Sequence, residues 1–367
     1  MQDRASQPSP FPLPVTVEGV TTGWLNAALR TRAPGITIRG SEVVDTVFST
    51  CSKIRLRLDR DEAARAAGIP ELVIVKGGFE EHGRLYDHMH EREVRGYRDV
   101  YPHVPLPHPA CYFADFDPEA RQGIVIMEDL VARGVEFCHA TRPQTREQVA
   151  RRLSALARFH AATWGSAELQ PGGRWHDLVE FFEVMQGFFD DKTSPANWAR
   201  FMAMPRGAAT SRLFQDRDWL VGAWAALRAF SDGLPHCVLH GDIHLGNLYI
   251  EADGTPGFLD TLASRGPAML EVAYHVCGAL DVADRARWEG ELVRHYLAEL
   301  GAAGAAAPGL EEAMRQYAVF QLYGYFIWTT TESHYQAEAV NTVNAMRATL
   351  AMLDHDTRGA IAELGVG

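Results

Sequence analysis

Apolar and β-branched residues gather in short runs over the first third of the chain. The runs typical of strands lie at residues 36–47, 53–58, 72–76 and 123–127. A pattern typical of a helix occupies residues 86–101, and the prolines that follow it, up to Pro109, end the helix. The pattern therefore predicts a β-rich region that contains one helix.

In the rest of the chain, apolar residues recur at spacings of three and four, which is typical of helices. Helices are predicted at residues 145–164, 212–231, 268–279, 285–300 and 311–330, with a small hairpin at 248–259. A β-rich lobe followed by a helical lobe predicts an α+β fold with a cleft at the junction, near residue 130. We expect a loose polar tail at 1–14, a first lobe at 15–130 and a second lobe at 131–367.

The composition fits an ordinary globular protein of 367 residues, with 47% hydrophobic and 22% charged residues. No apolar run approaches the roughly 20 residues that cross a bilayer, and the N-terminus lacks the pattern of a signal peptide. The five cysteines are scattered without a CxxC pair, and the net charge of −12 argues against non-specific nucleic-acid binding. We expect a cytoplasmic protein with no nucleic-acid partner and no membrane span.

Residues 240–247 read HGDIHLGN and contain the strongest candidate chemistry. Asp242 and Asn247 have the D-x-x-x-x-N spacing of kinase catalytic loops. A hydroxyl that attacks a phosphate in line needs a carboxylate to orient it and accept its proton, and ATP phosphates need Mg²⁺ held by oxygen ligands. Asp242 suits the first role and the amide oxygen of Asn247 suits the second. His240 and His244 are predicted to hold the loop in shape.

The hairpin after this segment predicts a second metal ligand. Asp253 and Gly254 form a strong signal for a two-residue turn between two short apolar strands. Counting back from that turn places Asn247 opposite Asp260, with Cβ atoms about 5 Å apart. Oxygen ligands of magnesium can span such a gap. The pattern therefore predicts a metal site made by Asn247 and Asp260.

Lys76 ends a predicted strand, so its ammonium is expected to emerge where it can bind ATP phosphates. In the predicted helix at 86–101, Glu93 lies on the face that carries the apolar residues. A carboxylate on an inward face needs a partner, and Lys76 is the one we expect. The alternative is that Glu93 pairs with Arg92, Arg95 or a loop.

Two further stretches are candidates for nucleotide contacts. Between the first two strands, Ser49, Thr50 and Ser52 can offer backbone N–H groups and hydroxyls to phosphates, although this loop contains no glycine. The neighbouring Cys51 is predicted to be a small filler. Near residue 130, the Glu128 carbonyl and the Leu130 N–H can recognise the edge of an adenine ring.

With these residues assembled, the chain resembles the aminoglycoside phosphotransferase / choline kinase superfamily, and within it the ecdysteroid-kinase-like branch. The resemblance spans residues 36–350 and is most specific in HGDIHLGN, the hairpin and the segment 258–260. It implies a two-lobed protein-kinase-like fold, with a small antiparallel sheet and one helix in the first lobe and a larger helical second lobe. It also implies ATP as phosphate donor, Mg²⁺ as cofactor and a small-molecule hydroxyl as acceptor.

The motif match implies a role for each candidate. By this match, Asp242 would be the catalytic base, Asn247 and Asp260 would be the metal ligands, and Lys76 with Glu93 would be the phosphate-binding ion pair. Each residue fills a position that the chemistry of phosphate transfer requires.

The sequence departs from the family pattern in two further places. Thr261 stands where relatives often carry an aromatic residue. Glu271 stands where the family usually has an aspartate that supports the catalytic loop, and a longer acid can reach the same backbone groups. Neither change removes an essential group, which favours an active enzyme.

Two alternatives stay open. The first is a nucleotide-binding pseudokinase without turnover. The second is a metal-dependent hydrolase, because His240, Asp242 and His244 alternate like ligands on a strand, and His236 and Asp260 are candidates for its further ligands.

The acceptor is expected to lie against the helical lobe, where the aromatic stretches 175–189 and 317–328 are candidate walls. An aminoglycoside site needs several acids that converge on amines, to which Glu332, Glu338 and Asp354 are candidate contributors. The aromatic content favours an apolar alcohol or a mixed substrate over a polycationic sugar.

Overall fold

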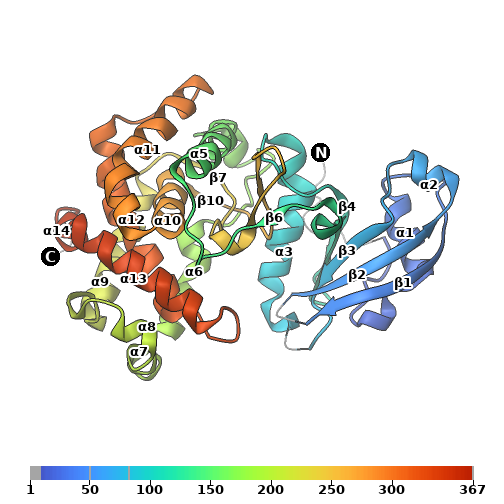
Figure 1. Cartoon of the computed structure of the whole chain (residues 1–367), viewed down its shortest axis with the longest axis horizontal. Helices are drawn as coiled ribbons and strands as arrows, with labels where there is room; N and C mark the ends of the chain where they lie inside the picture. The colour runs from blue at the N-terminus through green and yellow to red at the C-terminus, as the bar shows by residue number, and fades with distance from the viewer. Residues whose placement is uncertain (1–9, 49–50, 82, 366–367) are drawn as a thin grey trace. The chain divides into compact units, whose positions relative to one another are not determined.

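The computed structural model describes residues 10–48, 51–81 and 83–365, and the described chain divides into two compact units (Figure 1). Unit 1 comprises the chain up to Val104, His108–Val135 and the short segment Leu259–Ala263. Unit 2 comprises Pro105–Pro107, Glu136–Phe258 and the chain from Ser264 onward. The chain thus returns to unit 1 for a short segment that directly follows the hairpin.

The described part of unit 1 is built on a five-stranded antiparallel sheet in the order β1-β2-β3-β5-β4. The strands are β1 (Ile38–Val47), β2 (Ser52–Arg60), β3 (Leu72–Gly77), β4 (Cys111–Asp117) and β5 (Gln122–Glu128). In β2, every second side chain from Ser52 to Leu58 is buried, and the intervening side chains from Lys53 onward are partly or fully exposed. The buried face joins Leu25 and Leu29 of α1 (Thr22–Arg30) in the core of the unit.

Three further helices of unit 1 are α2 (Glu62–Ala66), α3 (Asp87–Arg95) and α4 (Leu130–Arg133). Helix α3 packs against β5 and β4 and continues as a π-helical turn over Gly96–Val100. A Cβ atom on Gly96 would lie 2.3 Å from Cγ2 of Thr261, so this close approach requires glycine. The segment that follows Asp260 therefore lies directly on the end of α3.

Unit 2 is mainly helical. Its helices are α5 (Arg146–Ala161), α6 (Phe181–Lys192), α7 (Pro195–Met202), α8 (Pro205–Ala208), α9 (Arg217–Asp232), α10 (Ala268–Ala279), α11 (Val282–Ala302), α12 (Leu310–Thr330), α13 (Glu338–Asp354) and α14 (Thr357–Ala362). Its strands are β6 (Glu136–Phe137), β7 (His236–Leu239), β8 (Leu248–Ile250), β9 (Pro256–Phe258) and β10 (Ser264–Pro267). Helix α12 packs against α10 and α13, and α5 packs against α11.

The predicted strands and helices are present with small shifts at their ends. The remaining elements were not predicted, because their patterns are short, irregular or apolar on several sides. They are helices α1, α2, α4, α6, α7, α8, α13 and α14 and strands β4, β6, β7 and β10. Residues 1–9 of the expected loose tail lie outside the described residues. The end of that tail is not loose, since Leu13 is buried and the Pro14 carbonyl accepts a hydrogen bond from Gln122.

The hairpin of β8 and β9 forms where the sequence predicts it, but in a register shifted by one residue. Leu248 faces Phe258 across the two strands. A two-residue turn would instead have placed Leu248 opposite Leu259. The strand-pairing argument that put Asn247 opposite Asp260 is therefore wrong by one residue.

The loop of the hairpin explains this shift. Gly254 has a φ of 82° and donates a backbone hydrogen bond to the Glu251 carbonyl. Such a turn followed by a left-handed glycine makes a three-residue loop, which changes the pairing by one position. The Asp-Gly signal is common to both loop types.

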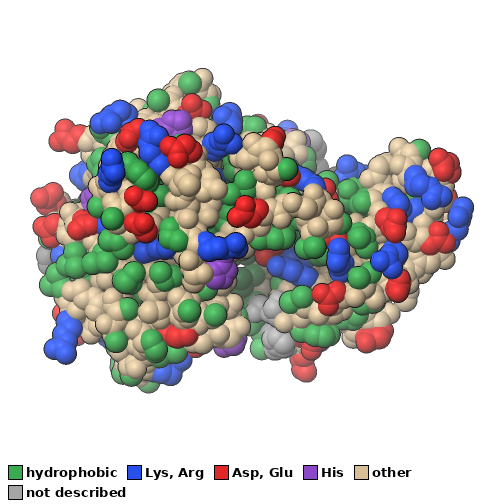
Figure 2. Space-filling view, in the orientation of Figure 1, with side chains coloured by type: hydrophobic (Ala, Val, Ile, Leu, Met, Phe, Trp, Pro, Cys, Tyr) green, Lys and Arg blue, Asp and Glu red, His purple; other side chains and the backbone are tan. Residues whose placement is uncertain are grey.

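Within the described residues, no helix combines the length and the apolar character that a membrane crossing requires. On the face drawn in Figure 2, Lys and Arg side chains lie among Asp and Glu side chains on both units.

Candidate active site

Unit 1 contains a compact cluster of charged side chains around Lys76. The Lys76 ammonium lies 2.6 Å from Oε1 of Glu93 and 2.8 Å from Oδ1 of Asp260. The other carboxylate oxygen of Asp260 lies 3.0 Å from Nζ of Lys53. The ion pair of Lys76 with Glu93 that the sequence predicts is thus present, and Asp260 joins it.

The elements of unit 1 explain this convergence. Lys53 and Lys76 are directly paired residues of β2 and β3, so their side chains emerge side by side on one face of the sheet. Glu93 comes from α3, where it is buried. Asp260 follows the end of β9 and has a φ of 56°, a left-handed conformation that interrupts the alternation of the strand.

Charge balance keeps Lys76 and Asp260 ionised. Burial by itself lowers the pKa of Lys76, but the carboxylates of Asp260 and Glu93 outweigh burial and hold this pKa well above its ordinary value. Burial raises the pKa of Asp260, and the two lysines outweigh it and hold that pKa far below its ordinary value. Lys76 and Asp260 are therefore both charged at neutral pH.

Cys51 lies beside this cluster without contributing a charge. Its sulfur is 3.4 Å from Nδ1 of His90 and 3.9 Å from Oε2 of Glu93. Burial raises the pKa of the Cys51 thiol well above its ordinary value, so the thiol stays protonated at neutral pH. A protonated thiol is a poor nucleophile, which agrees with the prediction that Cys51 only fills space.

The segment after Asp260 is fixed by α3. Arg92 is buried and donates hydrogen bonds to the carbonyls of Leu262 and Ala263, at 2.6 and 3.3 Å. Together with the contact of Gly96 and Thr261, these bonds hold the segment that follows Asp260 against the end of α3. Thr261, a departure from the family pattern, fits here because its small side chain lies against the glycine.

The other predicted nucleotide contacts have different outcomes. Ser49 and Thr50 lie outside the described residues. Ser52 is fully buried on the core face of β2, so any contact from Ser52 to a phosphate would come from its backbone. Glu128 ends β5, and Leu130 is the first residue of α4, just before the two amides that the Asp129 carboxylate caps.

In unit 2, the candidate catalytic loop follows β7. Asp242 has a side chain that is 28% exposed and stays reachable from solvent. The Asn247 amide donates to the backbone carbonyl of Asp242 at 2.9 Å and to its Oδ2 at 3.0 Å. The D-x-x-x-x-N spacing thus brings the two side chains together, because a turn at Leu245–Asn247 folds the loop back.

Buried side chains of α10, α5 and α11 hold this loop in place through hydrogen bonds. Glu271 accepts hydrogen bonds from the backbone N–H of Gly241 at 2.7 Å and of His240 at 3.3 Å. His160 lies 3.0 Å from Oε2 of Glu271, and its other ring nitrogen lies 2.9 Å from the Tyr296 hydroxyl. The longer acid at position 271 therefore does reach the backbone of the loop.

The two histidines of the loop make local contacts. Nδ1 of His240 accepts a hydrogen bond from the backbone N–H of Asp242, and His240 is fully buried. Nδ1 of His244 accepts from the N–H of Gly246, which places the proton of the neutral ring on Nε2. That nitrogen lies 3.6 Å from Oδ2 of Asp242, longer than a hydrogen bond.

These contacts bear on the hydrolase alternative. His240 uses Nδ1 for the backbone, and Nε2 of His236 lies 3.0 Å from the Ser231 carbonyl. Among the residues that the structure describes, no three or more His, Cys, Asp or Glu side chains group so as to hold a metal ion.

Aromatic side chains of α10 and α12 lie beside the loop. The rings of His244 and Trp328 meet edge to face at 5.4 Å between centroids, and Tyr274 stacks on Trp328 at 6.3 Å. Burial, reinforced by the charge of Asp242, raises the pKa of Tyr274 well above its ordinary value. Aromatic side chains therefore lie near Asp242 in unit 2.

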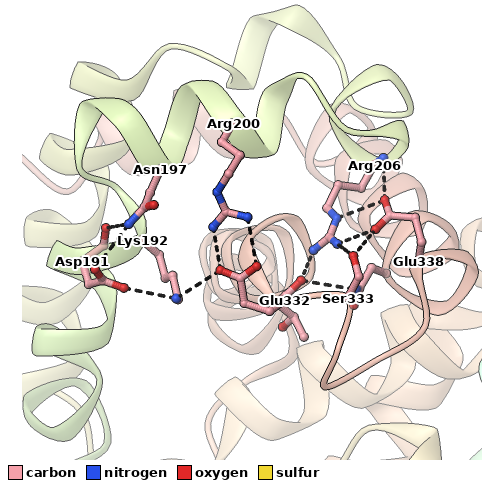
Figure 3. A network of polar contacts seen from close by, with 10 residues as sticks. Asp191, Lys192, Asn197, Arg200, Arg206, Glu332, Ser333 and Glu338 are labelled. Carbon is pink, nitrogen blue, oxygen red and sulfur yellow. Dashed lines mark hydrogen bonds and ion pairs between the residues drawn. The ribbon is translucent and has the colours of Figure 1, made fainter.

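The acids near the C-terminus are already paired. Figure 3 shows Glu332 between Arg200 and Lys192, with the Arg200 guanidinium at 2.6 Å. Glu338 contacts the guanidinium of the buried Arg206. These bonds join α6 and α7 to the segment between α12 and α13, and α8 to the first residue of α13.

The third candidate acid, Asp354, pairs with Arg285 of α11. All three acids therefore have a basic partner within unit 2.

Sequence reasoning missed two members of the site. Lys53 alternates with buried residues in β2 exactly as Arg55 and Arg57 do, so the pattern alone does not single it out. His160 lies on the inward face of a predicted helix, where a satisfied core histidine is the ordinary expectation. A signal for His160 was available, because a buried histidine on that face needs a polar partner.

Comparisons with known proteins agree with this arrangement. A family model described as the phosphotransferase enzyme family (APH) matches residues 76–316, more than half of the chain. The chain therefore belongs to the phosphotransferase enzyme family. No curated protein sequence matches it.

Solved structures are similar over nearly the whole chain. A candidate aminoglycoside phosphotransferase from Ralstonia eutropha has a TM-score of 0.55 at 15% identity, over 91% of this chain and 98% of that one. Choline kinase from Cryptosporidium parvum has a TM-score of 0.52 at 11% identity, over 94% of this chain and 97% of that one. The expected two-lobed, protein-kinase-like α+β fold is confirmed, with α1, α2 and α4 in unit 1 in addition to the predicted helix.

Proposed function

We propose that this phosphotransferase moves the γ-phosphoryl group of ATP to a hydroxyl of a small molecule. The observation that carries the proposal is the buried pair of Lys76 and Glu93 with Asp260 on the same ammonium. In kinases, a strand lysine held by a helix carboxylate binds the ATP phosphates, and an aspartate holds the metal. A purely structural ion pair would not need the second carboxylate.

Asp242 is the proposed catalytic base. Its carboxylate is partly exposed, and Asn247 holds one of its oxygens, so the other can orient the acceptor hydroxyl. The hydroxyl oxygen forms a bond to the γ-phosphorus, the bond from that phosphorus to the bridging oxygen of ADP breaks, and Asp242 takes the hydroxyl proton. Most of the rate acceleration comes from positioning and from neutralised charge.

Asn247 and Asp260 are the proposed magnesium ligands. Both supply the oxygen donors that Mg²⁺ prefers. The Asn247 amide group uses its nitrogen on Asp242, which leaves its oxygen available, and Asp260 is ionised at neutral pH. When bound, the metal neutralises charge on the phosphates.

The base of the nucleotide is proposed to bind at the end of β5. The Glu128 carbonyl and the Leu130 N–H would meet the adenine edge, as the connector position suggests. Ile74 and Met127 are paired residues on the face of the sheet that also carries Lys76, so they offer an apolar surface to the ring.

The acceptor is proposed to be an apolar or mixed alcohol. The support is the aromatic neighbourhood of Asp242, made by Tyr274, Trp328 and His244. Glu332 and Glu338, which are candidate contributors to an aminoglycoside site, are paired with arginines.

The test is a screen of alcohols, amino alcohols and sugars for acceptor-dependent ATP consumption with Mg²⁺. We expect turnover with at least one apolar or mixed alcohol. Asp242→Asn is expected to reduce kcat by about 10³-fold, because a general base contributes 10²–10⁴. Asp253→Asn, the same exchange in the hairpin loop, is the matched control and should keep full activity.

The outcomes separate the alternatives. Tight ATP binding with no turnover of any acceptor supports the pseudokinase. Phosphatase activity without ATP supports the hydrolase. Full activity of Asp242→Asn contradicts the assignment of the base.

A further inference from the structure

A second lysine accompanies Lys76 in unit 1. Lys53 is the direct cross-strand neighbour of Lys76, and both ammonium groups contact the carboxylate of Asp260, one on each oxygen. The two lysines differ in exposure, since the side chain of Lys53 is 40% exposed and that of Lys76 is 6% exposed. Lys53 can therefore meet a ligand without leaving the cluster.

The charges of the cluster are balanced only while the carboxylate of Asp260 is shared between Lys53 and Lys76. Two lysines face two carboxylates, and Glu93 contacts Lys76 at 2.6 Å. If Asp260 binds Mg²⁺, as the proposed function requires, its negative charge is committed to the metal. The positive charge of Lys53 then no longer has the carboxylate of Asp260 to itself. Lys53 also lies next to Lys76, whose ammonium is proposed to bind phosphate.

The loop that precedes β2 makes a cation at this position useful. The residues between β1 and β2 include no glycine, so they lack the residue type that lets a backbone approach phosphates closely. Ser52, the first residue of β2, is fully buried on the face of the sheet opposite Lys76. Lys53 is the next residue and points to the same face as Lys76.

We propose that Lys53 is a second phosphate-binding lysine, which contacts the polyphosphate of the nucleotide and selects ligands with two or more phosphates. The inference rests on the proposed function and deepens it by assigning a specificity residue on β2. In a glycine-rich loop, backbone N–H groups donate hydrogen bonds to the phosphates. Here the ammonium groups of Lys76 and Lys53 would donate to the phosphates in their place.

The test is calorimetric binding of ATP, ADP, AMP and adenosine, with Mg²⁺, to the full-length protein. Lys53→Met is expected to weaken ATP and ADP binding about tenfold, the effect of one charge-assisted contact, and to leave adenosine binding unchanged. Lys53→Arg should stay within about threefold of the wild type, because it keeps the charge. Arg57→Met is the matched control, since Arg57 lies on the same face of β2, is paired with Glu42, and should bind as the wild type does.

A structural role predicts a different result. If Lys53 only holds Asp260 in place, Lys53→Met should lower the melting temperature without ligand and weaken adenosine and ADP by the same factor. Equal loss for both ligands, or no loss for either, overturns the inference. Lys53→Gln gives a second charge-neutral variant and should reproduce the selective loss.

Failure of the inference can be told from failure of the proposed function. If the wild type binds ATP and the Lys53 variants match it, only the role of Lys53 is wrong. If the wild type binds none of the nucleotides, the proposed function itself is wrong.

Discussion

The candidate residues of unit 1 and those of unit 2 are held in different ways. In unit 1, Lys76 contacts the carboxyl groups of Glu93 and Asp260, and these mostly buried contacts position the three side chains. In unit 2, the loop around Asp242 is held by hydrogen bonds to backbone groups, chiefly those that Glu271 accepts. The first arrangement suits a ligand that brings charge of its own, and the second suits a group that must keep one orientation during reaction.

The difference has a direct energetic consequence. Removing one member of the charged cluster leaves its partners buried without compensation, which is more costly than the pair itself is worth. Removing an acceptor from the loop leaves backbone N–H groups unsatisfied, which costs less and is confined to the loop. The two regions should therefore respond differently to the same kind of substitution.

The largest effect is expected for Lys76→Met. It leaves Glu93 as an unpaired buried carboxylate and should lower the free energy of unfolding by about 3–5 kcal/mol, with loss of ATP binding. The double variant with Glu93→Gln removes both charges and should recover part of the stability but none of the nucleotide affinity. Urea unfolding and calorimetry measure the two quantities, and a stable single variant that binds ATP contradicts the account.

A smaller effect is expected for Glu271→Gln. The amide group can accept from only one of the two backbone N–H groups, so the free energy of unfolding should fall by about 1–3 kcal/mol. The kcat value should fall while the affinity for ADP stays unchanged, because unit 1 is untouched.

Glu311→Gln, at an exposed position of α12, is the matched control for this exchange and should change neither quantity. A loss of ADP affinity in Glu271→Gln equal to its loss of kcat would show that the two regions are not independent.

The smallest effect concerns one buried histidine in each region. Burial lowers the pKa of His90 in unit 1 to about 4 and that of His275 in unit 2 to about 3. In the unfolded chain these histidines bind protons as the pH falls through about 6.5. In the folded chain they bind protons only when the pH reaches about 4 for His90 or about 3 for His275. The two histidines therefore do not reduce the free energy of unfolding above pH 6.5, and this free energy falls as the pH drops below 6.5.

Each histidine contributes at most about 1.4 kcal/mol per pH unit in this window. Unfolding free energies measured from pH 7.5 to pH 5 should decrease, and His90→Gln and His275→Gln should each flatten the decrease. Equal slopes in the variants and the wild type would assign the pH dependence to other groups.

The comparison also shows how far sequence reasoning reaches. The pair of Lys76 and Glu93 was predictable because one residue ends a strand and the other lies on the inward face of a helix. The contact of Asn247 with Asp242 follows from a short spacing within one loop. Asp260 was singled out by its motif, but the argument for its position was wrong, because Gly254 makes a longer loop than the Asp-Gly signal implies.

The sequence by itself determined the fold class, the candidate catalytic segment and the charged pair, because these depend on local spacing and on the burial that periodic patterns impose. Only the tertiary structure decided that Lys53 faces Lys76, that Asp260 adopts a left-handed conformation and meets both lysines, and that His160 supports Glu271. These contacts depend on strand register and on the packing of distant elements. A change of one residue in register turns a side chain to the opposite face, and no local pattern records that choice.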